Sequence, residues 1–270
     1  MSWVNLDRVE ADGVLLECAT FGPPPGDAPT LVLLHEGLGC IALWRSFPDA
    51  LVEKTGCGVF VYSRAGYGQS DPALLPRPLD YMTREAIEEL PKVLNAAAIG
   101  RCILVGHSDG ATIAAIYAGS AVDARVRGLV LMAPHFFTEK VGLAEIEKTR
   151  ELFRVSELEE SMAKYHRDAK ATFRGWTDVW LDSEFKDWDV SDVIDYLRIP
   201  TLVIQGKNDQ YGTTAQVEEV ANRIYAPCDI EMLPDCKHSP HLDQPNVTTC
   251  LIAGFAQRLQ RIENEVVTVV

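Results

Sequence analysis

The sequence predicts an α/β fold in which a mostly parallel β-sheet is covered by helices. Three observations lead to this class. The short runs LVLL, VFVY, CILV, LVLM and TLVI are continuously apolar rather than alternating, as in strands that are buried on both faces. Helical patterns separate these runs along the chain. Glycine-rich and proline-rich stretches mark several of the boundaries.

The first half of the chain alternates strand-like and helical segments. Strands are expected at 14–22, 30–37, 58–62, 102–106 and 126–134. One helix is expected at 44–56, where it ends at a glycine, and another at 82–100. In the second helix Thr83 is the expected cap, and Pro91 should kink or restart the helix. A third helix, ATIAAIYAG, follows the strand at 102–106.

The alternation stops between about His135 and Arg198. This segment is charged and aromatic, contains two helical stretches, and holds three of the five tryptophans. The strand pattern resumes at 199–209 and is followed by a helix, a strand and a final helix. We therefore expect one α/β core domain made of residues 1–134 and 199–270, with residues 135–198 as a helical insertion.

The composition limits the classes of binding partner that we expect for this protein. The formal net charge of −14 disfavours binding to nucleic acid and to anionic membrane surfaces. The N-terminus does not resemble a signal peptide, and no apolar run approaches the roughly 18 residues that span a bilayer. The seven cysteines are scattered, without metal-ligand spacing. We therefore expect a cytoplasmic protein with buried thiols and no bound metal.

One motif places a serine at a junction between a strand and a helix. The sequence GHSDG at 106–110 fits the pattern G-x-S-x-G, with Ser108 at its centre. In this setting the serine occupies a strained turn, and the flanking glycines let the helix approach the strand closely. The N–H of Asp109 then lies at a helix N-terminus, where it can stabilise an oxyanion. The alternative is a serine in an ordinary strand-to-helix turn.

A serine hydroxyl is a weak nucleophile and needs a base that a third group orients. Asp209 follows the strand TLVIQG, and His238 lies between the last strand and the last helix. Both therefore lie at carboxyl ends of strands, the edge at which open α/β sheets build their sites. His241 is an alternative base, and Asp235 and Asp243 are less favoured acids.

These segments together resemble the α/β-hydrolase superfamily. The matching pieces are HEGLG, SRAGYGQSD, GHSDG, GKND and KHSPHLDQP, in the family's order and around an insertion at its cap position. The resemblance implies a sheet of roughly eight strands with a helical cap at 135–198. It also implies a triad of Ser108 as nucleophile, His238 as base and Asp209 as orienting acid, without a cofactor.

The resemblance also implies an oxyanion hole formed by the backbone N–H groups of Asp109 and Gly37. The family usually has glycine where this chain has Glu36, so Glu36 and Leu38 stay open as alternative positions for the second donor. Glu36 and Asp109 either bind a substrate ammonium group or are structural, with Asp109 capping the following helix.

The expected substrate contacts are Glu36 and four aromatic side chains, which either line an apolar acyl pocket or pack the insertion onto the core. These four are Phe136, Trp176, Trp180 and Tyr211.

The expected activity is hydrolysis of a small-molecule carboxylic ester with a small or medium acyl group, through an acyl-enzyme on Ser108. Family members that hydrolyse epoxides or dehalogenate haloalkanes have aspartate at the nucleophile position. The serine at position 108 therefore argues against both of these activities. Alternatives that share the triad are a carbon–carbon bond hydrolase of ring-cleavage products, an amide-cleaving aminopeptidase and a perhydrolase. A non-catalytic protein that binds a ligand is the alternative from another class.

Overall fold

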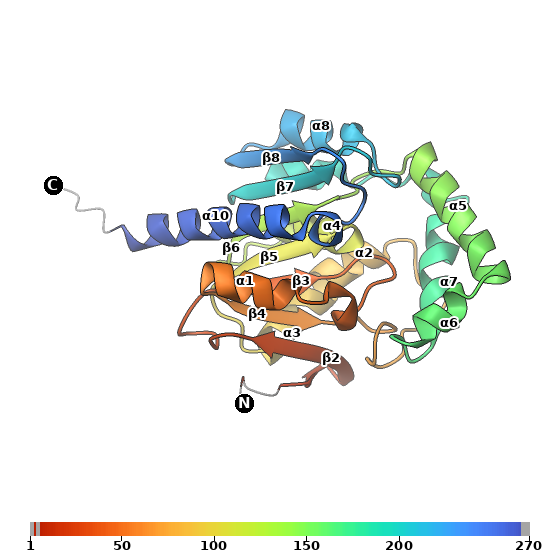
Figure 1. Cartoon of the computed structure of the whole chain (residues 1–270), viewed down its shortest axis with the longest axis horizontal. Helices are drawn as coiled ribbons and strands as arrows, with labels where there is room; N and C mark the ends of the chain where they lie inside the picture. Colours follow the sequence, from red (N-terminus) through yellow and green to blue (C-terminus); the bar gives the residue numbers. More distant parts are fainter. Residues whose placement is uncertain (1–2, 4–5, 266–270) are drawn as a thin grey trace.

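The computed structural model describes residue 3 and residues 6–265. Its centre is an eight-stranded sheet with the order β1-β2-β4-β3-β5-β6-β7-β8 (Figure 1). The pairs β1–β2 and β2–β4 are antiparallel, and all other neighbouring strands are parallel. The predicted mostly parallel sheet of roughly eight strands is therefore confirmed. The strands are β1 (Arg8–Ala11), β2 (Val14–Phe21), β3 (Thr30–Leu34), β4 (Gly58–Tyr62), β5 (Cys102–His107), β6 (Val126–Met132), β7 (Thr201–Gly206) and β8 (Cys228–Leu233).

The central strands are buried on both faces, as their continuous apolar runs predict. Along β3, Leu31 and Leu33 belong to one hydrophobic cluster, whereas Val32 and Leu34 belong to a second cluster on the other face. Helices α1 and α10 cover the first cluster and lie together in front of the sheet in Figure 1. Helices α3, α4 and α8 contribute to the second. The helices of these layers and their connections are η1 (Ile41–Trp44), α1 (Phe47–Thr55), α2 (Tyr81–Arg84), η2 (Glu85–Glu89), α3 (Leu90–Ala96), α4 (Asp109–Ser120), α8 (Thr214–Arg223), α9 (Pro240–Asp243) and α10 (Pro245–Asn264).

The region predicted as one helix at 82–100 is interrupted. A π-helical turn, η2, separates α2 from α3. Pro91 lies at the start of α3 and has no N–H to donate to the preceding turn, so the helix restarts there. The cap prediction is wrong, because Thr83 lies inside α2 and Asp80 holds the N-cap position. Helix α1 ends as expected at Gly56, which has φ +69°.

Between β6 and β7 the chain forms α5 (Lys140–Val155), α6 (Leu158–Ala163), α7 (Ala169–Trp180), η3 (Phe185–Asp187) and η4 (Ser191–Tyr196). Figure 1 shows α5, α6 and α7 at one end of the sheet, outside the two helical layers. Helix α7 reaches the loop after β3, where Trp176 lies against Gly37. Within residues 6–265, no helix has both the length and the apolar character needed to cross a membrane.

Candidate active site

Ser108 occupies a strained turn between β5 and α4. Its backbone has φ +53° and ψ −119°, a conformation that residues with side chains rarely adopt. Its N–H donates to the carbonyl oxygen of Met132 at 2.9 Å, and its own carbonyl accepts from Ala111 and Thr112 at 2.8 and 3.0 Å. These three bonds hold the strained turn and fix the serine at the start of α4.

The glycines that flank Ser108 are required by the close approach of α4 to the sheet. A Cβ on Gly106 would lie 2.3 Å from the carbonyl oxygen of Gly110. A Cβ on Gly110 would lie 2.1 Å from the carbonyl oxygen of Leu34. Neither glycine has a positive φ. Glycine is therefore needed at both positions because there is no room for a side chain. The backbone conformation itself does not require glycine.

Asp209 and His238 come together at the carboxyl ends of β7 and β8. The ring Nδ1 of His238 lies 2.8 Å from Asp209 Oδ2 and 3.0 Å from Oδ1. The carboxylate also accepts from the Tyr211 N–H and the Gln205 amide, each at 2.8 Å. Burial favours the neutral acid, but the hydrogen bond and charge of His238 outweigh it and lower the pKa of Asp209 to about 2. An ionised Asp209 favours the His238 tautomer that leaves Nε2 free to accept a proton.

His238, rather than His241, lies at the cavity beside Ser108. Ser108 and His238 line the same cavity, although the hydrogen bonds of the described residues include none between the serine hydroxyl and this ring. His241 packs instead against Trp44, with ring centroids 4.7 Å apart. Burial and the charge of His107 lower the pKa of His241 to about 3. Of the two histidines, His238 is the one that pairs with Asp209.

The loop after β3 is fixed by His35 and Arg64. The N–H of Arg64 donates to Nε2 of His35 at 3.1 Å, so the other ring nitrogen, Nδ1, donates to the Glu36 carbonyl at 2.7 Å. The Arg64 guanidinium donates to the carbonyls of His35 and Glu36 at 2.6 and 3.1 Å. Burial lowers the pKa of His35, which matches this neutral tautomer. His35 is therefore a structural residue that sets the backbone of the loop.

Gly37 lies in this loop beneath the indole of Trp176. A Cβ at position 37 would lie 2.1 Å from Trp176 Nε1, so any side chain there would have to displace the indole or the loop. The N–H groups of Gly37 and Asp109 donate to no acceptor among the described residues, and both residues line the cavity beside Ser108. Both N–H groups are thus available as the two expected oxyanion donors.

The acid beside the nucleophile is buried and hydrogen-bonded within the protein. The Tyr81 hydroxyl donates to Oδ2 of Asp109, and the indole N–H of Trp180 donates to the Tyr81 hydroxyl at 3.1 Å. Burial raises the pKa of Asp109, although the positive charge of Arg64 opposes the rise. This chain of hydrogen bonds links α4 through α2 to α7 and favours a structural role for the Asp109 carboxylate.

Glu36 is the second acid at the cavity, and its carboxylate faces His107. Its Oε2 lies 3.8 Å from Nδ1 of His107, and 28% of its side chain is exposed. Burial favours the neutral acid, but the electrostatic interaction with His107 outweighs it and lowers the pKa of Glu36 to about 2. Glu36 is therefore an ionised carboxylate at the edge of the cavity.

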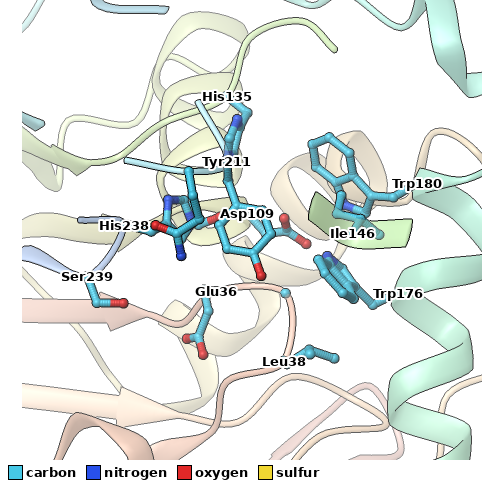
Figure 2. A pocket seen from close by; sticks show the side chains of 13 residues that line it. Glu36, Leu38, Asp109, His135, Ile146, Trp176, Trp180, Tyr211, His238 and Ser239 are labelled. Carbon is cyan, nitrogen blue, oxygen red and sulfur yellow. The ribbon is translucent and has the colours of Figure 1, made fainter. Parts of the chain in front are cut away.

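The cavity beside Ser108 has a volume of about 200 Å³ and combines an apolar wall with converging polar groups. Figure 2 shows Trp176 and Trp180 across the cavity from His238. Within the described part of the chain, no group of three or more His, Cys, Asp or Glu side chains could hold a metal ion. The lining residues are Glu36, Gly37, Leu38, Ser108, Asp109, His135, Ile146, Trp176, Trp180, Gln210, Tyr211, His238 and Ser239.

The expected substrate contacts Glu36, Trp176, Trp180 and Tyr211 all line this cavity, but Phe136 does not. Phe136 is fully buried in the core, and its N–H donates to the Gln216 side chain at 2.7 Å. Phe136 therefore takes the second of the two roles left open, packing onto the core, and is not the expected substrate contact. Several other lining residues were not predicted as substrate contacts, although Leu38 was considered as an oxyanion donor. Three of them directly follow the expected site residues Gly37, Asp209 and His238, and this position in the sequence could have identified them. The missed residues are Leu38, His135, Ile146, Gln210 and Ser239.

Comparison with known proteins agrees with this fold. Residues 29–154 match a family model described as the alpha/beta hydrolase fold. The chain has the α/β-hydrolase fold, and its curated relatives and structural neighbours lie in the α/β-hydrolase superfamily. The matched region contains the strained serine turn and the loop after β3, and the eight-stranded sheet is the sheet of α/β hydrolases.

The names of the proteins similar to this chain describe different hydrolytic reactions. It is 25% identical to the sn-1-specific diacylglycerol lipase ABHD11 of Danio rerio, over 86% of this chain and 80% of the relative. It is 23% identical to epoxide hydrolase 3 of Xenopus tropicalis, over 84% and 71% of the two chains. The structure of 2-hydroxy-6-oxo-6-phenylhexa-2,4-dienoate hydrolase from Rhodococcus sp. strain RHA1 superimposes with a TM-score of 0.78 at 16% identity. The superposition covers 93% of this chain and 98% of the hydrolase. This last likeness shows the fold alone.

Proposed function

We propose that this α/β hydrolase cleaves a carboxylic ester of a small or medium acyl group through an acyl-enzyme on Ser108. The observation that carries the proposal is the buried Asp209–His238 pair, with Nδ1 and Oδ2 2.8 Å apart, on the same cavity as the strained Ser108. A base oriented by an ionised acid beside a serine at a helix N-terminus is the arrangement that acyl transfer requires.

In the first half of the reaction the Ser108 hydroxyl attacks the ester carbonyl carbon while Nε2 of His238 takes its proton. The negative charge that develops on the carbonyl oxygen is stabilised by the N–H groups of Asp109 and Gly37. Asp209 stabilises the imidazolium of His238 through the hydrogen bond to Nδ1. Collapse of the tetrahedral intermediate breaks the bond to the leaving alkoxide, which takes the proton from Nε2.

In the second half His238 acts as a base toward water. Nε2 takes a proton from the water molecule as its oxygen attacks the acyl carbon. The second tetrahedral intermediate collapses, and the Ser108 oxygen leaves with the proton held on Nε2. The carboxylic acid departs and the enzyme returns to its starting state, so the residues of this chain complete the cycle.

The cavity supports a substrate with a small or medium acyl group. Its volume of about 200 Å³ lies below the roughly 300–1,000 Å³ that is typical of sites for drug-sized ligands. We propose that residues 135–198 act as a cap over the core formed by residues 1–134 and 199–270. Ile146 on α5 and the two tryptophans of α7 support this role, because they supply the apolar wall.

Two features of the chain and one relative support the proposal. The residue in the strained turn is a serine, whose attack on an acyl carbon gives an ester that water can hydrolyse. The seven cysteines are all free thiols, which supports a reducing compartment such as the cytoplasm. One relative with 25% identity is named a lipase, an enzyme that cleaves esters.

A substrate panel tests the proposed reaction. The wild type and Ser108→Ala should be compared on p-nitrophenyl acetate, butyrate, octanoate and palmitate, on the matching anilides, and on a vinylogous diketone. We expect wild-type rates to be highest for acetate or butyrate and to fall with chain length, and Ser108→Ala to lose activity by orders of magnitude. Cleavage of the diketone without ester hydrolysis would instead support a carbon–carbon bond hydrolase.

A further inference from the structure

His107, the second residue of the GHSDG motif, lies between the loop after β3 and the backbone of the proposed base. Its side chain is 2% exposed. Its Nε2 lies 2.7 Å from the backbone carbonyl oxygen of His238. Its Nδ1 is buried, has no hydrogen-bond partner, and faces Oε2 of Glu36 at 3.8 Å. One ring therefore touches two parts of the site that are far apart in the sequence.

The chemistry of these contacts determines where the ring protons lie. A carbonyl oxygen can only accept, so Nε2 of His107 must carry a proton. In a neutral ring Nδ1 would then present a lone pair to the Glu36 carboxylate, and two electron-rich atoms would face each other in a buried site. A proton on Nδ1 removes this repulsion and places an imidazolium against the carboxylate.

The buried side chains of His241 and His135 near His107 add no positive charge near neutral pH. The ring centroid of His107 lies 4.9 Å from that of His241 on α9 and 5.1 Å from that of His238. Burial lowers the pKa of His241 to about 3, and burial likewise lowers the pKa of His135, behind His238, to about 3. Glu36 is thus the charged group that faces Nδ1 of His107, the ring nitrogen without a hydrogen-bond partner.

We propose that Glu36 and His107 form an ion pair that positions the site, because it ties the loop after β3 to the backbone of His238 through the end of β5. Glu36 and His107 are positioning residues, and the carboxylate serves the protein rather than a substrate ammonium group. The ion pair follows from the geometry alone; its effect on turnover rests on the proposed function.

Matched substitutions separate positioning from substrate binding. Glu36→Gln removes the charge, and His107→Gln keeps an N–H donor for the His238 carbonyl while removing the group that faces Glu36. We expect each change to lower kcat on the order of tenfold to a hundredfold with little change in KM. The double variant should lose no more than the worse single variant, because the two residues act as one unit. Glu53→Gln, at an exposed position on α1, is the control for loss of one negative charge.

Two other results of these substitutions would contradict the proposal. Independent, multiplicative losses in the double variant would show that the residues act separately and would overturn the proposal. A rise in KM confined to aminoacyl esters in Glu36→Gln would show that the carboxylate binds a substrate ammonium. Equal loss for aminoacyl and plain acyl esters is the result that positioning predicts.

Nitrogen-15 NMR of protein labelled at histidine tests the pair without any turnover. We expect both ring nitrogens of His107 to be protonated in the wild type at pH 7, and Nε2 alone to be protonated in Glu36→Gln. A neutral His107 in the folded wild type would overturn the ion pair. If the enzyme hydrolyses no ester but the NMR result holds, the proposed function fails while the ion pair stands.

Discussion

The indole of Trp176 occupies the space that any side chain at Gly37 would need. A Cβ at position 37 would lie 2.1 Å from Nε1 and 2.4 Å from Cδ1 of that ring. The loop proposed to bind the oxyanion is thereby packed directly against α7. Gly37→Ala must displace either the indole or the loop, and we expect kcat/KM for p-nitrophenyl butyrate to fall at least about tenfold.

A double variant tests whether this contact is the cause. Trp176→Ala removes the ring, so Gly37→Ala in that background should cost much less activity than it does in the wild type. Full activity of Gly37→Ala, or an equal loss in both backgrounds, would show that the indole does not constrain the loop.

The hydrogen bonds from Trp180 through Tyr81 to Asp109 predict a stability effect. Tyr81→Phe leaves a buried carboxylate and a buried indole N–H without their common partner. We expect the free energy of unfolding to fall by about 1–3 kcal/mol, measured by urea denaturation. Tyr225→Phe, at a residue that is 90% exposed, is the matched control and should leave stability unchanged. Equal stability of the two variants would contradict the structural role given to Asp109.

The strained turn around Ser108 predicts a strong dependence on Gly110. Its Cβ would lie 2.1 Å from a backbone oxygen of β3, an atom that cannot move without disturbing the sheet. Gly110→Ala should therefore unfold the protein or lower its unfolding free energy by more than about 3 kcal/mol. Gly254→Ala on α10, where a Cβ meets no atom within 4 Å, should be neutral or stabilise by up to about 1 kcal/mol. Thermal denaturation of the two variants distinguishes these outcomes.

The buried histidines predict how stability depends on pH. Burial lowers the pKa of His241 to about 3, below the ordinary value of about 6.5. Between these values the unfolded chain binds a proton that the folded protein does not, so the unfolding free energy falls as pH drops through this window. His135 acts in the same direction, whereas Asp209 and Glu36, with pKa values of about 2, contribute mainly below about pH 5.

Removing one of these histidines should weaken the dependence of the unfolding free energy on pH. His241→Gln should lose less stability than the wild type between about pH 7 and pH 4, as measured by urea denaturation at each pH. Curves of equal slope would show that His241 is not held in its neutral form by the fold.

The parts of the molecule that follow from local patterns were predictable. The continuous apolar runs predicted the parallel strands, because side chains such as Leu31 and Val32 must enter opposite layers of the core. The strained turn of Ser108 and the need for Gly106 and Gly110 followed from the motif and its place between a strand and a helix.

Contacts between distant segments were not predictable. The sequence allowed two roles for Asp109, and the choice depends on Tyr81 and Trp180, which lie 28 and 71 positions away. Phe136 failed as a pocket residue because only three-dimensional packing decides which of several aromatic side chains faces the core. The contact between Glu36 and His107 likewise joins the loop after β3 to the end of β5, two segments whose separation the sequence does not specify.

Covalent labelling tests the role of Ser108 most directly, because it requires no knowledge of the natural substrate. The wild type, Ser108→Ala and Asp209→Asn should be incubated with a fluorophosphonate and analysed by intact-protein and peptide mass spectrometry. We predict one phosphonyl group on Ser108 of the wild type, slower labelling of Asp209→Asn, and none of Ser108→Ala. A folded wild-type protein that takes no label, or takes it at another residue, would contradict the assignment of Ser108 as the nucleophile.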